Sequence, residues 1–217
     1  MLIVQPSVQL INALSRKDLY TQIELAGRVC YKSEDKITDD SAEGFIRRVL
    51  NRGHEAVIEH ASISLKVVCD RGVTHEIVRH RIASYCQEST RYCNYSQDKF
   101  GQQISVIEPL YLDKSSIAYK IWCCACANAE NAYFSMLSSG CSPQEARAVL
   151  PNSLKTEIVI TMNPREWRHF FTLRCAPAAH PQMRQVALMA LEVMHTMYPV
   201  LFEDIAEKFL GEGGTHV

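Results

Sequence analysis

Apolar residues follow two kinds of spacing along the chain, and these spacings predict short strands separated by longer helices. Alternation of apolar and polar positions, or a run of β-branched residues, is typical of half-buried strands. The predicted strands are Leu2–Gln5, Ile63–Cys69, Gln102–Glu108 and Leu154–Met162. Apolar residues three or four positions apart are typical of amphipathic helices. The predicted helices are Asp18–Tyr31, Asp39–Arg52, Gly72–Arg81, Ser115–Ser139, Asn163–Arg174 and Met183–Met197.

Capping residues mark the ends of several of these helices. Gly53 and Gly140 follow apolar helical patterns and are expected to stop them. Ser142 to Glu145 has the spacing of a capping box with proline at the first helical position, so a short helix is expected to carry Arg147. Asn163 precedes a proline in the same way and is expected to be an N-cap.

The order of these elements favours an α+β fold, with an antiparallel or mixed sheet packed by helices, because strands and helices alternate without a regular βαβ rhythm. The length of 217 residues suits one domain or at most two small ones. A single domain is expected to span residues 1–210 and to be followed by a flexible Gly-rich tail at 211–217. Met183–Met197 is apolar on most sides, so this helix is expected to be deeply buried or to face another subunit. No G-x-G-x-x-G motif is present, so any dinucleotide-binding site is expected to be of a non-Rossmann kind.

Composition and charge restrict the environment and partners of the protein. A net charge of −1 argues against general attraction to nucleic acid or membranes. No uninterrupted apolar run reaches the roughly 18 residues of a membrane span. The first residues lack the pattern of a signal peptide, and nine cysteines, an odd number, suggest reduced thiols. A cytoplasmic location is therefore expected.

The most informative chemical pattern is a basic triplet followed by a polar segment. In the predicted Gly72–Arg81 helix, Glu76 would share a face with Arg79 and His80, and Arg81 would lie on the more apolar side, where a guanidinium needs an anion. The next segment, Ser84–Thr90, is predicted to be a loop whose hydroxyls and N–H groups suit a phosphate. The alternative is a surface helix with solvated charges.

Two further arginines stand out because apolar residues flank them. Arg147 lies in Ala-Arg-Ala-Val-Leu-Pro and Arg174 in Thr-Leu-Arg-Cys. For either arginine taken alone, an ordinary surface charge is the commoner role, because most arginines are exposed.

Other kinds of site, such as a zinc site or a catalytic nucleophile, are less well supported by the spacing of the residues. His54–Glu55 would begin a zinc-binding H-E-x-x-H motif, but Ile58 occupies the position of the second histidine. The C-x-x-C spacing of Cys123–Cys126 has no second pair and lies in an apolar helical pattern, which favours structural thiols. Neither Cys86 nor Ser89 has an activating base that the sequence identifies, so neither is expected to be a nucleophile.

The string from Arg79 to Tyr92, RHRIASYCQESTRY, resembles the signature of the flavin-dependent thymidylate synthases (the ThyX family). Gly53-His54-Glu55 followed by Glu59-His60 resembles a second segment of that family, and further pieces follow in its order along almost the whole chain. The resemblance implies an FAD-dependent enzyme that converts dUMP to dTMP, with methylenetetrahydrofolate as carbon donor and NADPH as reductant. It also implies a fold particular to the family and a homotetramer with shared active sites.

The resemblance also implies roles for individual residues. Arg174 is expected to be the catalytic residue, contacting the pyrimidine and stabilising its negative charge. The residues expected to bind FAD are Arg79, His80, Arg81, Gln87, Asn163, Arg165 and His169. Those expected to bind dUMP are Glu76, Arg79, Gln87, Glu88, Ser89, Thr90, Arg91, Arg147 and Arg174. No metal ligand is implied.

Four positions depart from the family pattern. Glu76 stands where glutamine is frequent, Cys86 where asparagine is frequent, Ala56 in place of a hydroxyl, and His169 where some members have asparagine. Two other functions stay open: a non-catalytic nucleotide- or RNA-binding module, whose arginines would capture phosphate, and a metal-dependent hydrolase. Bound flavin would distinguish the enzyme from the first, and stoichiometric zinc would favour the second.

Overall fold

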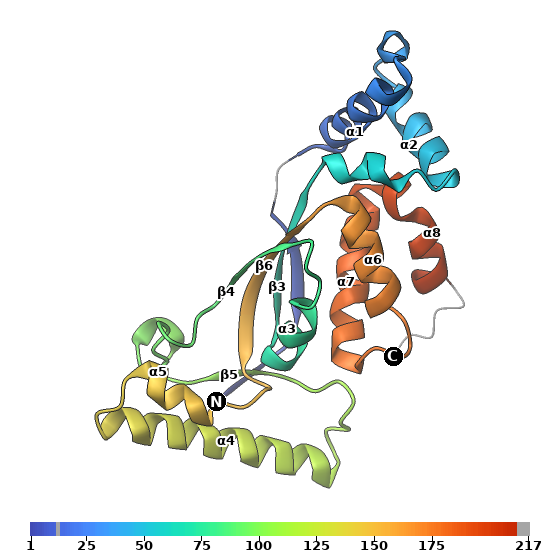
Figure 1. Ribbon diagram of the computed structural model, residues 1–217. Helices are drawn as coiled ribbons and strands as arrows, with labels where there is room; N and C mark the ends of the chain where they lie inside the picture. The colour runs from blue at the N-terminus through green and yellow to red at the C-terminus, as the bar shows by residue number, and fades with distance from the viewer. Residues whose placement is uncertain (12–13, 212–217) are drawn as a thin grey trace. The chain divides into compact units, whose positions relative to one another are not determined.

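The computed structural model describes residues 1–11 and 14–211 (Figure 1), so the predicted tail at 211–217 lies outside the described residues except for Gly211. The fold is α+β, with helices packed on an antiparallel sheet, which confirms the predicted class. The larger sheet is four-stranded, and its order is β2 (Ser7–Leu10), β3 (Ile63–Asp70), β6 (Lys155–Met162), β4 (Ser84–Gln87). The smaller sheet pairs β1 (Leu2–Val4) with β5 (Ser105–Ile107) in parallel.

The predicted helices agree with the observed ones within a few residues at each end, except that the helix predicted at Gly72–Arg81 ends at Ile77. The α-helices are α1 (Arg16–Tyr31), α2 (Ser41–Asn51), α3 (Arg71–Ile77), α4 (Ile117–Ser138), α5 (Pro143–Ala146), α6 (Pro164–Arg174), α7 (Pro181–Met197) and α8 (Pro199–Leu210). Short 3₁₀ helices are η1 (Glu34–Lys36), η2 (Glu55–His60), η3 (Asp98–Phe100) and η4 (Arg147–Val149). The capping residues explain this agreement: Gly53 and Gly140 have φ of 71° and 94°, a left-handed backbone that glycine adopts without strain. The capping box of Ser142 and Glu145 is present as expected.

The chain forms two compact units, which are described separately below. Unit 1 comprises residues 1–7, 67–79 and 86–158, and unit 2 comprises residues 8–66, 80–85 and 159–217. The prediction of a single domain over residues 1–210 stays a prediction.

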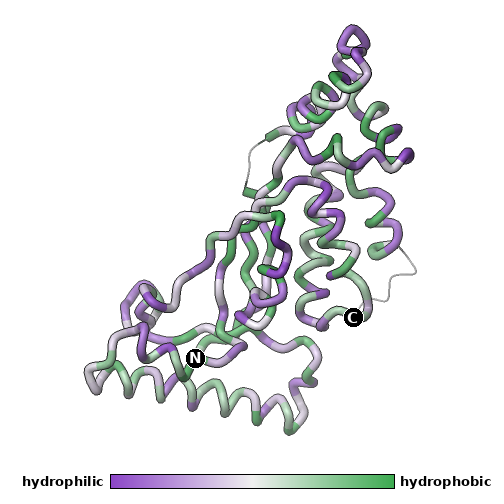
Figure 2. The backbone as a smooth tube through the Cα atoms, viewed as in Figure 1, coloured by the Kyte–Doolittle hydropathy of each residue, from purple (hydrophilic) through white to green (hydrophobic). Residues whose placement is uncertain are grey.

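Unit 1 has a core built on one side of the long helix α4. Cys126 and Tyr133 of α4 are buried against Tyr95, Val106 and Leu154. Apolar residues recur along the whole of α4 (Figure 2). Burial raises the pKa of Cys126 to about 11, as suits a packed thiol rather than a reactive one.

Unit 2 is a helical assembly in which α6, α7 and α8 lie side by side (Figure 1). Trp167 of α6 is fully buried, stacks on Phe171 and donates its indole N–H to the carbonyl of Ile63 at 3.0 Å. The apolar residues of α7 are largely covered by α6 and α8. The predicted deep burial of this helix is therefore seen within the chain itself.

Three sequence interpretations are corrected around the basic triplet. Helix α3 ends at Ile77, so Arg79 and His80 follow it instead of sharing a helical face with Glu76. Arg81 is exposed and does not lie on an apolar side. Ser84–Gln87, predicted to be a loop, is strand β4, because these residues pair beside β6 and alternate between exposed and half-buried positions.

Strand β2 and helix α8 were not predicted. Among the described residues, no helix combines the length and the apolar character needed to cross a lipid bilayer.

Candidate functional site

A cavity of about 690 Å³ in unit 2 gathers three of the residues expected to bind flavin: Asn163, Arg165 and His169. Its walls come from η2, helix α6 and the last turns of α8, which contributes Lys208 and Phe209. The lining therefore combines cations and a helix N-terminus with apolar surface. Such a combination suits a ligand that has both anionic and planar apolar parts.

Helix α6 places these side chains because its N-terminus is fixed. The Asn163 side chain accepts a hydrogen bond from the Glu166 N–H at 2.8 Å, and Pro164 occupies the first turn. Asn163 is thus an N-cap, as the sequence predicts, and the positive end of the helix dipole lies at the cavity. Buried Trp167 anchors the opposite face of the same helix.

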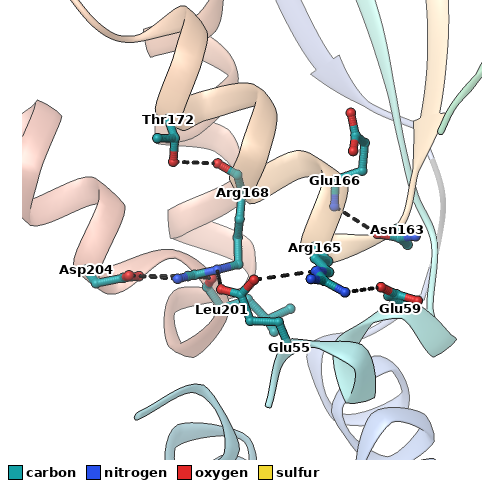
Figure 3. Close-up of polar contacts among 9 residues, drawn as sticks. All are labelled: Glu55, Glu59, Asn163, Arg165, Glu166, Arg168, Thr172, Leu201 and Asp204. Carbon is teal, nitrogen blue, oxygen red and sulfur yellow. Dashed lines mark hydrogen bonds and ion pairs between the residues drawn. The ribbon is translucent and has the colours of Figure 1, made fainter. Parts of the chain in front are cut away.

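Arg165 is held by two carboxylates of η2 (Figure 3). Its Nη1 donates to Glu59 Oε1 at 2.6 Å, and its Nε lies 3.5 Å from Glu55 Oε2. The hydrogen bond to Glu59, together with the charges of Glu59 and Glu55, raises the pKa of Arg165. Because these groups are about half exposed, the pairs are weak enough to exchange for a ligand anion.

Arg168, which the sequence analysis did not identify, completes this wall of the cavity. Its guanidinium forms two 2.7 Å hydrogen bonds to the Asp204 carboxylate and one of 2.7 Å to the Leu201 carbonyl (Figure 3). Glu55 Oε1 lies 3.6 Å from its Nε. Arg168 therefore ties α6 to α8, and Glu55 lies against both arginines.

His80 is buried and engaged at both ring nitrogens. Nδ1 lies 3.1 Å from Glu166 Oε1, and Nε2 accepts a hydrogen bond from Arg174 Nε at 3.1 Å. Its ring lies 4.9 Å from that of Phe170. Burial lowers the pKa of His80, Glu166 opposes that shift, and Arg174 and His169 add to it, so the ring is neutral at pH 7.

Arg174, the predicted catalytic residue, ends helix α6 and is half-buried. The nearby Tyr85 hydroxyl donates to the His80 carbonyl at 2.6 Å, and burial raises the pKa of Tyr85 to about 12. Tyr85 therefore stays protonated and fixes the His80 backbone. The result is a largely buried polar cluster with one guanidinium at its edge.

In unit 1, part of the predicted nucleotide-binding segment is held by hydrogen bonds. The Gln87 amide donates to the hydroxyls of Thr74 and Thr156 at 3.1 and 3.3 Å. Glu88 accepts from the Tyr95 hydroxyl and from Lys155, both at 3.1 Å. Both side chains are thus oriented by neighbours from distant parts of the sequence.

The following residues form a tight turn. The N–H groups of Tyr92 and Cys93 donate to the Ser89 carbonyl, and the Arg91 N–H donates to the Ser89 hydroxyl at 3.3 Å. Thr90 is buried, whereas Arg91 is exposed with its guanidinium 5.5 Å from the Tyr92 ring centre. A turn of this kind presents a hydroxyl and a guanidinium on neighbouring residues.

The other predicted residues of unit 1 lie as follows. Arg147 is exposed and follows the Ser142 capping box, at the start of η4. Arg79 is exposed just after α3, in which Glu76 is half-buried. Cys86, the rejected nucleophile, is an exposed thiol on β4.

Sequence reasoning identified Arg165 and His169 in the unit 2 site but missed Arg168, Thr172 and Glu166, although a signal for the first two was present. Arg165, Arg168, His169 and Thr172 follow one another at i, i+3, i+4 and i+7, the spacing of a single polar helix face, and all four line the cavity. Glu166 could not be found in this way, because its partner His80 lies 86 residues earlier.

One group of side chains among the described residues has the composition of a metal site. The ligand atoms of His80, Glu166 and His169 lie within 4.8 Å of one another. The Arg174 guanidinium, however, donates directly to His80 Nε2. A permanent cation at that nitrogen disfavours a metal ion there.

Comparisons with known proteins agree along the chain. A family model described as thymidylate synthase complementing protein matches residues 9–200. A flavin-dependent thymidylate synthase of Geobacter sulfurreducens is 33% identical over 189 residues, covering 84% of this chain and 80% of that protein. One of Pyrococcus abyssi is 36% identical over 192 residues, covering 85% of this chain and 77% of that protein.

A solved structure extends the agreement to the fold. The crystal structure of a UMP/dUMP methylase from Streptomyces cacaoi, bound with 5-Br dUMP, superposes with a TM-score of 0.75 at 24% identity, covering 96% of this chain and 98% of that one. Taken together with the sequence relatives, this places the chain in the family of flavin-dependent thymidylate synthases.

Proposed function

We propose that this protein methylates dUMP at C5 to form dTMP, using a bound flavin. The observation that carries the proposal is the match of the family over residues 9–200, supported by relatives that are 33% and 36% identical over most of the chain. The non-catalytic nucleotide-binding alternative is not favoured, since these relatives are named as synthases.

The flavin is proposed to be FAD, bound at the cavity of unit 2. The residues present fit such a group: the N-terminus of α6, Arg165 and Lys208 can meet phosphate, and Ile82 and Phe209 offer apolar surface. Bound FAD would carry reducing equivalents from NADPH and complete the methyl group, whose carbon would come from methylenetetrahydrofolate. Arg165 would exchange Glu59 for the phosphate. His169 and Asn163 would flank the ligand.

Two further residues of the basic triplet, Arg79 and Arg81, are proposed to contribute to flavin binding through their charge. Both guanidiniums are exposed and are therefore accessible to an anionic ligand. His80 differs from them because both of its ring nitrogens already have protein partners.

The nucleotide is proposed to be held mainly by the segment Gln87–Arg91, with Glu76, Arg79 and Arg147. Ser89 and Arg91 offer a hydroxyl and a guanidinium, the donors that phosphate prefers. Gln87 and Glu88 are pre-oriented by Thr74, Thr156, Tyr95 and Lys155, so little side-chain freedom would be lost on binding.

Arg174 is proposed to be the catalytic residue. Its guanidinium would stabilise negative charge on the pyrimidine as C5 becomes nucleophilic. A guanidinium keeps its proton under all relevant conditions, so it acts by charge and hydrogen bonding and not as an acid. No protein nucleophile is needed, so Cys86 is given no catalytic role.

The protein is further proposed to be a cytoplasmic homotetramer. Support for association comes from α4, on which Ile117 and Ile121 are 76% and 63% exposed one turn apart. Apolar side chains grouped in this way are typical of a surface covered by another subunit.

The test is purification followed by three measurements. Flavin absorbance, calorimetric binding of dUMP, and formation of dTMP from dUMP with methylenetetrahydrofolate and NADPH are all expected. Protein that stays colourless after incubation with excess FAD and does not bind dUMP would refute the proposal.

A further inference from the structure

The buried contact between His80 and Arg174 determines where the imidazole proton lies. A guanidinium has only donors, so the His80 Nε2 that lies 3.1 Å from Arg174 Nε must be unprotonated and accept. The single proton of the neutral ring is then on Nδ1, which faces Glu166 Oε1 at 3.1 Å. The order of donation is therefore Arg174 to His80 to Glu166.

The surroundings keep this arrangement in place. The His80 ring packs 4.9 Å from Phe170 and edge-on to His169 at 5.7 Å, and its carbonyl accepts from the Tyr85 hydroxyl. The titratable and charged groups that face it are Glu166, His169, Arg174 and Tyr85. Glu166 is the only carboxylate among them, so it alone favours a proton on the near nitrogen, Nδ1.

We propose that Glu166 and His80 are positioning residues for Arg174. Glu166 holds His80 in the Nδ1–H tautomer, and the His80 Nε2 lone pair then fixes Arg174 through its Nε. This inference rests on the proposed function, in which Arg174 acts on the pyrimidine. It assigns a role to Glu166, which the resemblance left without one, and a role to the His80 ring other than direct contact with flavin.

The geometry explains why Arg174 needs such a device. It is the last residue of α6, and holding its long side chain in one orientation costs rotamer entropy. Fixing Nε also fixes the plane of the guanidinium, because the group is rigid and planar. The two Nη groups then keep one orientation, as is required to stabilise charge on a flat ring.

The experiment combines a direct view of the tautomer with a double-mutant cycle. Long-range ¹H–¹⁵N spectra of histidine-labelled protein, compared with Glu166→Gln and His80→Phe, report which nitrogen of His80 carries the proton. Calorimetric Kd values for dUMP are measured for wild type, Glu166→Ala, Arg174→Ala and the double variant. Glu203→Gln is the matched control, because Glu203 pairs with Arg47 outside the cavity lining.

Wild type is expected to show the Nδ1–H tautomer. Glu166→Ala is expected to weaken dUMP binding about 10-fold, as loss of a hydrogen bond to a charged group commonly does, and to add little in the Arg174→Ala background. Glu166→Gln keeps an acceptor for Nδ1–H and the backbone N–H that Asn163 caps, so it should fold normally and lose less affinity. Glu203→Gln should behave as wild type.

Two results would overturn the inference: an Nε2–H tautomer in wild type, or losses from Glu166 and Arg174 that add independently. Stoichiometric zinc at His80 would also overturn it, because the metal would displace Arg174 from the ring. Failure of the proposed function looks different, since wild type would then form no dTMP while the tautomer remained Nδ1–H.

Discussion

Replacing Glu59 with glutamine is expected to tighten the binding of FAD. In the structure Glu59 occupies the Arg165 guanidinium through a 2.6 Å contact, at a place where a flavin phosphate is proposed to bind. The carboxylate therefore competes with the ligand for the same donor. Glutamine keeps the size of the side chain but removes its charge.

The magnitude follows from the exposure of the pair. The side chains of Arg165 and Glu59 are 50% and 42% exposed, and an ion pair of that kind contributes roughly 0.2–1 kcal/mol. Glu59→Gln should therefore lower the Kd for FAD by at most about 5-fold, since about 1.4 kcal/mol corresponds to 10-fold. The gain should shrink at high ionic strength, because salt screens exposed charges.

The assay is titration of FAD into flavin-free protein, followed by flavin fluorescence at low and high salt. Glu203→Gln is the control, because it makes the same change of charge on an exposed pair, here with Arg47, at a residue that does not line the cavity. Unchanged or weaker binding in Glu59→Gln at low salt would refute the competition. A gain of equal size in Glu203→Gln would show that only the net charge matters.

Arg174→Ala should abolish dTMP formation while circular dichroism stays native, and near-normal turnover would remove Arg174 from the mechanism. Cys86→Ala should retain substantial activity, and its complete loss with flavin and dUMP still bound would show that a thiol nucleophile exists. kcat/KM for dUMP should fall as the pH drops below 6.5 through the lowered pKa of His80, because a protonated Nε2 cannot accept a hydrogen bond from Arg174. The unfolding free energy should fall in the same pH range, because the unfolded state binds that proton at a higher pH than the folded state does. A flat profile of both quantities from pH 7 to 5 would contradict both expectations. Gly27→Ala should lower the unfolding free energy, measured by urea denaturation, by about 1–3 kcal/mol, because a Cβ at Gly27 would lie 2.6 Å from the Phe45 ring. Equal or greater stability would show that the ring moves aside freely.

Local signals predicted much of the fold correctly. Asn163 and Pro164 marked the start of α6, and Gly140 marked the end of α4, because caps and left-handed turns depend on a few adjacent residues. Helix α8 also had a signal, Pro199 at its first position and apolar residues at helical spacing, which the sequence analysis overlooked.

Other features depend on contacts that no local pattern contains. The helix predicted to reach Arg81 stops at Ile77, since the next residues turn toward β4 and His80 becomes buried beside Glu166 of α6. Likewise, the carboxylates that hold Arg165 lie more than 100 residues earlier in the chain. The sequence therefore predicted local elements and caps more reliably than the partners of individual side chains.

The single span from Asn163 to Arg174 contains the N-cap of helix α6, the two cavity arginines and the proposed catalytic arginine. Each added or deleted residue in a helix rotates everything after it by about 100°. An insertion after Arg165 would thus swing Trp167 out of the hydrophobic interior and Arg174 away from His80 at once. We expect this segment to tolerate substitutions on its solvent-exposed side but no insertion or deletion, because any change in length would displace the buried tryptophan and the terminal arginine together.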